Sequence, residues 1–181
     1  LRPILAMISG RESWPMRLSP FIVLTALLLW PSDAGSAEQL VAAKIIVFKS
    51  ERRMELLDVK SKILKAYEVS LGGNPEGPKS QQGDSRTPEG IYKISSRNPG
   101  SSYHLSLRIS YPNRQDIAEA EALGVAPGGD IFIHGLQNGQ GVLGSRHLLY
   151  DWTDGCIAVT NQEIEEVWNM VPDGTPIEIR P

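Results

Sequence analysis

Short apolar runs separated by turn residues recur along this 181-residue sequence, and they restrict the fold more than any other feature. In residues 103–111, Leu105, Leu107 and Ile109 alternate with polar residues, which is the period of a half-buried β-strand. Roughly eight strands are expected, which predicts a mainly β domain, a barrel or a sandwich, decorated by helices. The runs lie at 41–48, 54–59, 63–71, 90–95, 103–111, 130–134 and 176–179, with a hairpin at 54–71 and a further short run after Cys156.

Two segments carry helix signals, so the expected class is α+β. Asn113 can cap a helix over residues 113–123, and Gly124 stands where a C′ glycine would end it. Thr160 and Glu163 form a capping-box pattern at the start of a second helix. The apolar face of this helix has helical spacing and consists of Ile164, Val167, Trp168 and Val171.

A long polar segment, residues 72–90, is dense in glycine, proline, serine, asparagine and glutamine, and it is predicted to be a loop. Loops of this length inside a compact domain are uncommon and often functional, although a mobile connection is the alternative. Asp84 and Arg86 within it could contact a charged ligand or could be solvated surface charges.

The N-terminal residues have the order of a secretory signal peptide. Two arginines precede an uncharged apolar run over residues 21–30, and small residues then continue to Ala37. The run is shorter than the roughly 20 residues that a membrane span needs, although an uncleaved N-terminal anchor is the alternative. Residues 1–37 therefore predict export to the periplasm or cell envelope, and residues 38–181 form the expected catalytic domain.

The composition argues against several classes of partner. The formal net charge is −3 and the basic residues are scattered, so we expect no nucleic-acid partner. The one cysteine cannot form an internal disulfide. No pair of candidate ligands has a metal spacing such as C-x-x-C or H-x-x-x-H, so we expect no metal and no other cofactor. We also expect a monomer.

The single cysteine, Cys156, follows Gly155 and precedes an apolar run, while His134 ends an earlier strand beside Gly135. A nearby imidazole can take the proton of a thiol and return it to a leaving group, so this pair predicts a Cys/His nucleophilic site. Gly155 lets the backbone turn sharply, and amides around Cys156 could then face a developing oxyanion. The alternative is a free cysteine that is buried like an ordinary apolar residue.

The motifs around these residues give a resemblance to a known family. Ile133-His134-Gly135 and Thr153-Asp154-Gly155-Cys156-Ile157 resemble the catalytic motif of the L,D-transpeptidase catalytic-domain family. The upstream segment Thr87-Pro-Glu-Gly-Ile-Tyr92 is similar to the Thr-Pro-x-Gly-x-Tyr segment of that family. The resemblance covers nearly all of the chain after the leader, and it implies a mixed β-sandwich or barrel with the catalytic site in a cleft.

The resemblance also implies a substrate and a role for each motif residue. The family acts on peptidoglycan stem peptides, one as acyl donor and a second as acceptor. Cys156 would form a thioester with the donor, His134 would act as general base and acid, and the carbonyl of Gly135 would orient the imidazole. The amides of Gly155 and Cys156 would form the oxyanion hole, and Thr153 would shape the turn.

The sequence departs from the family pattern at Asp154, where many members have histidine, and at Ala158, where many have arginine or asparagine. Asp154 adds a negative charge near the thiol, and Arg146 could pair with it or could be a solvated arginine. The departures leave the acceptor open. An amine would make the protein a transpeptidase, and water would make it an L,D-carboxypeptidase or an amidase that releases a wall-anchored protein. A non-catalytic wall-binding module is a further alternative, although it would need neither His134 nor Cys156.

Overall fold

The structure is a computed structural model that describes residues 40–181. The predicted signal peptide, residues 1–37, lies outside the described residues and stays a prediction. Among residues 40–181, no helix is both long enough and apolar enough to cross a lipid bilayer.

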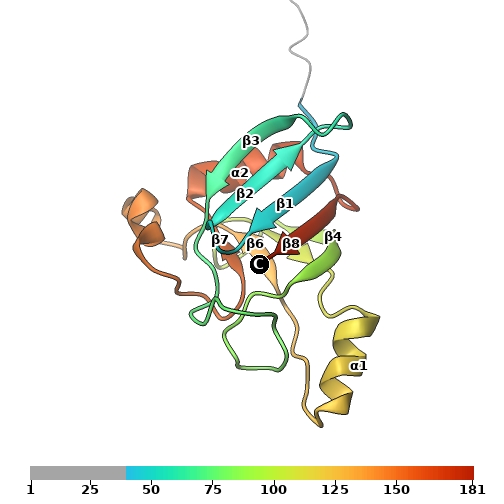
Figure 1. The fold of residues 1–181 in the computed structure, drawn as a ribbon. Coiled ribbons are helices and arrows are strands. Elements are labelled where there is room, and N and C mark those ends of the chain that lie inside the picture. The colour runs from blue at the N-terminus through green and yellow to red at the C-terminus, as the bar shows by residue number, and fades with distance from the viewer. Residues whose placement is uncertain (1–39) are drawn as a thin grey trace, which may run out of the picture. The chain divides into compact units, whose positions relative to one another are not determined.

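Eight strands form one mixed sheet that curls into a half-barrel (Figure 1). Their order across the sheet is β3-β2-β1-β8-β4-β5-β6-β7. Most neighbours are antiparallel, but β1 pairs with β8, and β6 pairs with β7, in parallel. This arrangement confirms the predicted mainly β class with helices. The strands are β1 Lys44–Phe48, β2 Arg53–Leu57, β3 Ile63–Glu68, β4 Gly90–Asn98, β5 Ser106–Ile109, β6 Phe132–His134, β7 Ile157–Ala158 and β8 Pro176–Arg180.

Both predicted helices form, and a third helical segment lies where the sequence predicts none. Asn113 caps the first helix, and the capping box between Thr160 and Glu163 starts the last one. The last helix buries Ile164 and Val167 in the same apolar cluster as the strands. The third segment consists of short 3-10 turns that carry no apolar periodicity, so no sequence pattern predicts it. The helical segments are α1 Arg114–Ala122, η1 Gly141–Leu149 and α2 Asn161–Met170.

Strand β5 is shorter than the alternating pattern predicts. It begins at Ser106 instead of residue 103, because His104 has a positive φ of 67° that does not fit a strand. The alternation pattern reports which side chains are buried, and it does not report where the backbone leaves the strand conformation.

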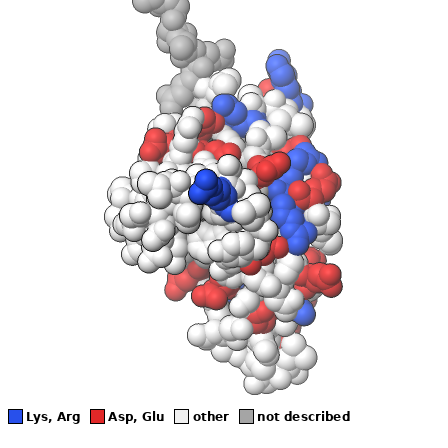
Figure 2. Space-filling view, turned by 90° about the vertical axis from the view of Figure 1, so that its left-hand side faces the viewer, with Lys and Arg blue, Asp and Glu red and all other residues white. Residues whose placement is uncertain are grey.

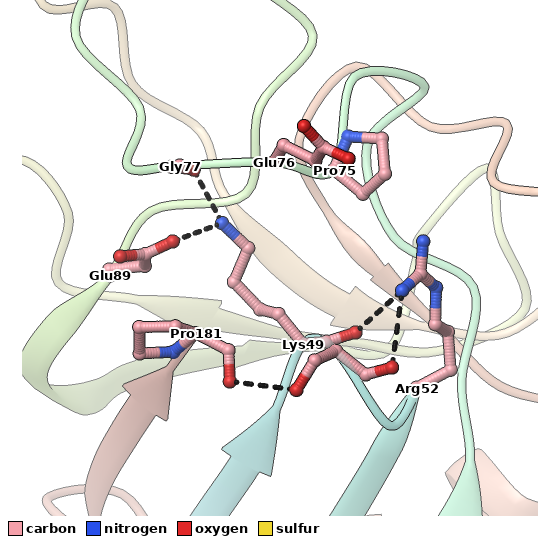
Figure 3. A pocket seen from close by; sticks show the side chains of 8 residues that line it. Lys49, Arg52, Pro75, Glu76, Gly77, Glu89 and Pro181 are labelled. Carbon is pink, nitrogen blue, oxygen red and sulfur yellow. Dashed lines mark hydrogen bonds and ion pairs between the residues drawn. The ribbon is translucent and has the colours of Figure 1, made fainter.

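Residues 73–89 form a loop, as predicted, and a buried lysine fixes this loop to the sheet. Lys49 directly follows β1, and its side chain is only 2% exposed. Its ammonium group donates hydrogen bonds to the carbonyl oxygens of Gly77 at 2.6 Å and Thr87 at 3.0 Å, and it pairs with Glu89 at 2.7 Å (Figure 3). The lysine therefore joins both arms of the loop to the end of β1.

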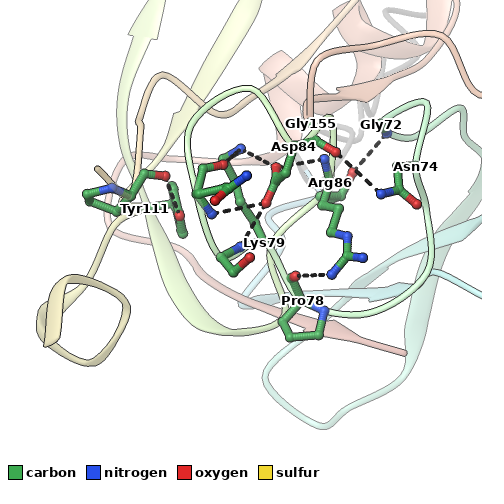
Figure 4. Close-up of polar contacts among 12 residues, drawn as sticks. Gly72, Asn74, Pro78, Lys79, Asp84, Arg86, Tyr111 and Gly155 are labelled. Atoms are coloured by element: carbon green, nitrogen blue, oxygen red, sulfur yellow. Dashed lines mark hydrogen bonds and ion pairs between the residues drawn. The ribbon is translucent and has the colours of Figure 1, made fainter. Parts of the chain in front are cut away.

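Asp84 organises the tip of the same loop (Figure 4). Its carboxylate pairs with Lys79 at 2.7 Å, and the two side chains are 8% and 3% exposed. It also accepts hydrogen bonds from the backbone amides of Ser80 at 2.8 Å, Gln81 at 3.1 Å and Arg86 at 3.0 Å. The prediction that Asp84 is a solvated surface charge is therefore wrong, because its carboxylate is held by contacts inside the loop. Its contact with a charged ligand stays a prediction.

Candidate active site

His134 and Cys156 are brought together by the parallel pairing of two short strands. His134 is the last residue of β6, and Cys156 immediately precedes β7. Ile133 lies opposite Ile157, and His134 lies opposite Ala158. As a result, both candidate side chains line one pocket of about 400 Å³.

The imidazole of His134 is oriented by the neighbouring backbone. Its Nδ1 atom lies 2.7 Å from the carbonyl oxygen of Gly135. Because a carbonyl oxygen only accepts hydrogen bonds, Nδ1 carries the proton, and Nε2 is the basic nitrogen. Burial lowers the pKa of His134 below its usual value, although the Gly135 hydrogen bond opposes this effect. The imidazole therefore rests in its neutral form and can accept a proton at Nε2.

Two aromatic side chains of the pocket enclose this imidazole. The centroid of the Tyr103 ring lies 4.6 Å from that of the His134 imidazole. The centroid of the Trp152 ring lies 5.8 Å from it, and the Trp152 and His134 rings pack edge to face at an angle of 67°. Both aromatic residues also line the pocket of Cys156. Such contacts restrict rotation of the imidazole and leave it 5% exposed.

The thiol of Cys156 rests beside the backbone that leads into β6. It donates a hydrogen bond of 3.7 Å to the carbonyl oxygen of Asp130. Burial raises the pKa of the Cys156 thiol to about 11, and the carboxylates of Asp154 and Asp130 add to the rise. A hydrogen bond from the Phe132 amide lowers the pKa and so opposes this rise. At neutral pH the resting pair is therefore a thiol and a neutral imidazole.

No hydrogen bond joins Cys156 to His134 among residues 40–181 in this resting arrangement. Hydrogen bonds between catalytic groups are often absent without substrate and tighten in the substrate complex. Rotation of the thiol away from Asp130 would direct its proton into the pocket that holds the imidazole. The arrangement can thus support proton transfer from sulfur to Nε2 once a ligand occupies the pocket.

The turn before the cysteine is fixed by Thr153. Its hydroxyl group donates a hydrogen bond to the carbonyl oxygen of Cys156 at 2.8 Å and accepts one from the amide of Gly155 at 3.1 Å. The Gly155 amide is therefore committed to Thr153, and the predicted oxyanion hole with two amide donors is not formed in this structure. The Cys156 amide has no acceptor in residues 40–181, which leaves it as the candidate oxyanion donor.

A Gly155→Ala variant is expected to lose about 1–3 kcal/mol of unfolding free energy. Gly155 has a φ of 126°, and a Cβ atom there would lie 2.5 Å from the carbonyl oxygen of Arg86. Urea unfolding measures the loss. Gly139→Ala is the matched control, because Gly139 also has a positive φ but has nothing within 4 Å of its Cβ position. Equal losses in the two variants would contradict a packing role for Gly155.

Two carboxylates stand at the mouth of the thiol pocket. Asp130 and Asp154 line this pocket, and they also line an adjoining pocket of about 760 Å³. Among the residues lining the thiol pocket, all within the described chain, there is no lysine or arginine. Asp130 already pairs with Arg108 at 3.3 Å, so the carboxylate of Asp154 is the one that favours a positively charged group of a ligand.

Arg146 does not lie in the thiol pocket. It is exposed on η1, and no ion pair joins it to Asp154 among residues 40–181, so the proposed pairing of these two residues is wrong. Instead Arg146 lines a separate pocket on the other side of Trp152. The sequence also gave no signal for Tyr103 or Asp130, because their places in the site depend on how distant strands pair.

Alkylation of Cys156 by iodoacetamide is expected to accelerate about tenfold per pH unit from pH 6 to pH 10, because only the thiolate reacts and its pKa lies above this range. Asp154→Asn should increase the rate at pH 8, since the Asp154 carboxylate raises the pKa of the thiol. Asp173→Asn is the control, because Asp173 is an exposed partner of Arg97. A rate plateau below pH 8 in the unaltered protein would contradict a buried, neutral thiol.

Comparison with known proteins finds relatives with the same fold. The model of the family described as YkuD, L,D-transpeptidase catalytic domain, matches residues 42–179. The YafK protein of Escherichia coli K12 is 29% identical over 149 residues, which cover 78% of this chain and 52% of YafK. The chain therefore spans about half the length of this curated relative.

Solved structures agree with the family match. The helical cell shape determining protein Pgp2 from Campylobacter jejuni has a TM-score of 0.60 and 26% identity, over 76% of this chain and 47% of Pgp2. An L,D-transpeptidase from Xylanimonas cellulosilytica has a TM-score of 0.51 at 14% identity, over 78% of this chain and 62% of that protein, and it supports the fold alone. Members of the matched family act on peptidoglycan stem peptides. The chain belongs to the L,D-transpeptidase catalytic-domain family.

Proposed function

We propose that this protein is an exported L,D-transpeptidase that acts on peptidoglycan stem peptides through a thioester on Cys156. One observation carries the proposal. Cys156 and His134 line a single pocket, and the Gly135 carbonyl holds the imidazole in the tautomer that has a free basic Nε2. That is the arrangement a cysteine acyltransferase requires.

In the first half of the reaction, Nε2 of His134 takes the thiol proton, and the sulfur attacks the carbonyl carbon that follows the L-centre of the diamino acid. The amide of Cys156 stabilises the oxyanion. The imidazolium then returns its proton to the nitrogen of the departing D-amino acid as the amide C–N bond breaks. The donor stem peptide is left as a thioester on Cys156.

In the second half, the amine of a second stem peptide attacks the thioester carbonyl. His134 takes a proton from this amine and returns it to the sulfur as the C–S bond breaks. The products are a new amide cross-link and the free thiol. Asp154 supports an amine acceptor, because a carboxylate in the lining of the pocket attracts a protonated amine to the site.

The test uses the mature protein with a tetrapeptide muropeptide as donor and a second stem peptide as acceptor, followed by mass spectrometry. A cross-linked dimer supports the proposal. Loss of the terminal D-residue without a dimer would show that water is the acceptor and that the protein is an L,D-carboxypeptidase. Release of a wall-linked protein would show an amidase. Binding of the stem peptides without any adduct or turnover would refute the proposed enzymatic activity. It would indicate a non-catalytic wall-binding module.

A further inference from the structure

A second pocket, of about 330 Å³, lies directly behind the aromatic wall of the candidate active site. Trp152 lines both pockets, so its indole ring separates this second pocket from the one that holds Cys156 and His134. The second pocket is formed by the residues after His134-Gly135 and by η1, and we call it the Arg146 pocket. Its place beside the nucleophile suits a part of the same ligand.

The Arg146 pocket has buried polar atoms that the protein does not satisfy. His147 is 4% exposed and lines the pocket. Its Nδ1 atom lies 3.3 Å from the hydroxyl oxygen of Ser70, which donates its own hydrogen to the carbonyl oxygen of His147 at 2.9 Å. Nδ1 therefore carries the ring proton, and Nε2 is an acceptor.

Nε2 of His147 and Nε1 of Trp152 are both buried and have no hydrogen-bond partner among residues 40–181. More than nine in ten buried polar groups are paired in native proteins, so two unpaired atoms on residues that line one pocket are unusual. One atom is an acceptor and the other a donor. Both atoms are enclosed in this structure, so a peptide ligand reaches them when the two side chains turn toward the pocket. Its amide N–H can then donate to His147, and a carboxylate or carbonyl can accept from Trp152.

The charge of the Arg146 pocket is opposite to that of the thiol pocket. Arg146 is the single formally charged residue among the residues that line it, all of which are described. The thiol pocket contains Asp130 and Asp154 and no basic residue among its described lining. A ligand that spans Trp152 would therefore meet carboxylates on one side and a guanidinium group on the other.

The surface around η1 has the character of a contact surface. The segment η1 is the orange coil at the left of Figure 1, and Figure 2 shows that side of the domain. In Figure 2, one isolated basic side chain is surrounded by uncharged ones. Val142, Leu149 and Tyr150 on and beside η1 are exposed apolar or aromatic residues. Such a concentration of exposed apolar side chains around one charge is typical of a binding site.

We propose that the Arg146 pocket is a specificity subsite that binds a free carboxylate of the donor stem peptide, while an ammonium group of that peptide faces Asp154. This inference rests on the proposed function. The guanidinium group of Arg146 can bind a carboxylate through two parallel hydrogen bonds, which an amidated stem peptide cannot accept in the same way.

Isothermal titration calorimetry on the Cys156→Ala protein tests the proposal without turnover. The two ligands are a stem tetrapeptide with free carboxylates and the same peptide with its side-chain carboxylates amidated. Loss of a charge-assisted contact predicts that amidation weakens binding about tenfold or more. In the Arg146→Gln background the two peptides should bind equally, and Trp152→Phe should weaken binding of the free carboxylate form.

Arg114→Gln is the matched control, since Arg114 is an exposed arginine on α1 that lines neither pocket. Unchanged discrimination in Arg146→Gln, or equal loss in Arg114→Gln, would overturn the subsite. The outcome is separable from the proposed function. If binding to Cys156→Ala depends on Arg146 but the unaltered protein turns over no stem peptide, only the transpeptidase is refuted. If the unaltered protein turns over both peptides and Arg146→Gln changes neither binding nor rate, only the subsite is refuted.

Discussion

A Cys156→Ala variant is expected to lose turnover of stem peptides by at least about 10⁴-fold, because no other group can form the acyl-enzyme. The fold should be retained. In residues 40–181 the thiol donates one long hydrogen bond, of 3.7 Å, to the carbonyl oxygen of Asp130, and the Phe132 amide donates to the sulfur, so its removal leaves no strong contact unmade. The measurement is the rate of tetrapeptide consumption by mass spectrometry, together with a circular dichroism spectrum and a peptide titration.

The same assay separates the two candidate histidines. His134→Gln should lower the rate on the order of 10²–10⁴-fold, which is the usual contribution of a general base. His104→Gln is the control, because His104 pairs with Glu165 at 2.6 Å and lines no part of the thiol pocket. If Cys156→Ala turns over stem peptides as fast as the unaltered protein, another residue is the nucleophile.

The features that the sequence predicts correctly are those that depend on neighbouring residues. The cap at Asn113 and the capping box at Thr160 need only four consecutive positions, and the alternation around Leu107 needs only one strand. The contact between His134 and the Gly135 carbonyl, which the family resemblance implied, also joins adjacent residues. Local signals of this kind survive folding because tertiary contacts do not have to supply them.

The features that the sequence does not predict depend on distant pairing. Tyr103 and Asp130 enter the site through the antiparallel pairing of β5 with β6, which no local pattern specifies. Asp84 lies in a polar loop and therefore resembles a surface charge, yet its partner Lys79 is buried with it. Arg146 is close to the cysteine in sequence, but the turns of η1 and the ring of Trp152 place it in another pocket.

An Asp84→Ala variant is expected to lose about 3–5 kcal/mol of unfolding free energy, which is the usual cost of leaving one charge of a buried ion pair uncompensated. Lys79 would keep its ammonium group in a site where it is 3% exposed, and three backbone amides would lose their acceptor. The loss is measured by urea unfolding at pH 7. Asp173→Ala is the control, because the pair of Asp173 and Arg97 is exposed, and it should cost less than about 1 kcal/mol.

The pH dependence of this loss has a defined sign. Burial alone would raise the pKa of Asp84, but hydrogen bonds from Lys79 and the loop amides outweigh it and hold the pKa below its usual value. A carboxyl group with a lowered folded-state pKa contributes stability above its unfolded pKa of about 3.9 and loses it as the pH falls through the folded value. The gap between Asp84→Ala and the unaltered protein should therefore be constant from pH 5 to pH 7 and shrink below about pH 4.

The same substitution should also disturb the nucleophile, because the loop that Asp84 organises packs directly against the cysteine turn. The amide of Arg86 is held by Asp84, and the carbonyl oxygen of Arg86 would lie 2.5 Å from a Cβ atom at Gly155. Loosening this contact frees Gly155. Iodoacetamide should therefore alkylate Cys156 in folded Asp84→Ala at a rate that differs from the rate in the unaltered protein. Removing the buried cation as well, in Lys79→Met with Asp84→Ala, should recover part of the stability. A double variant no more stable than Asp84→Ala would show that the lost amide acceptor, and not the uncompensated lysine, dominates the cost.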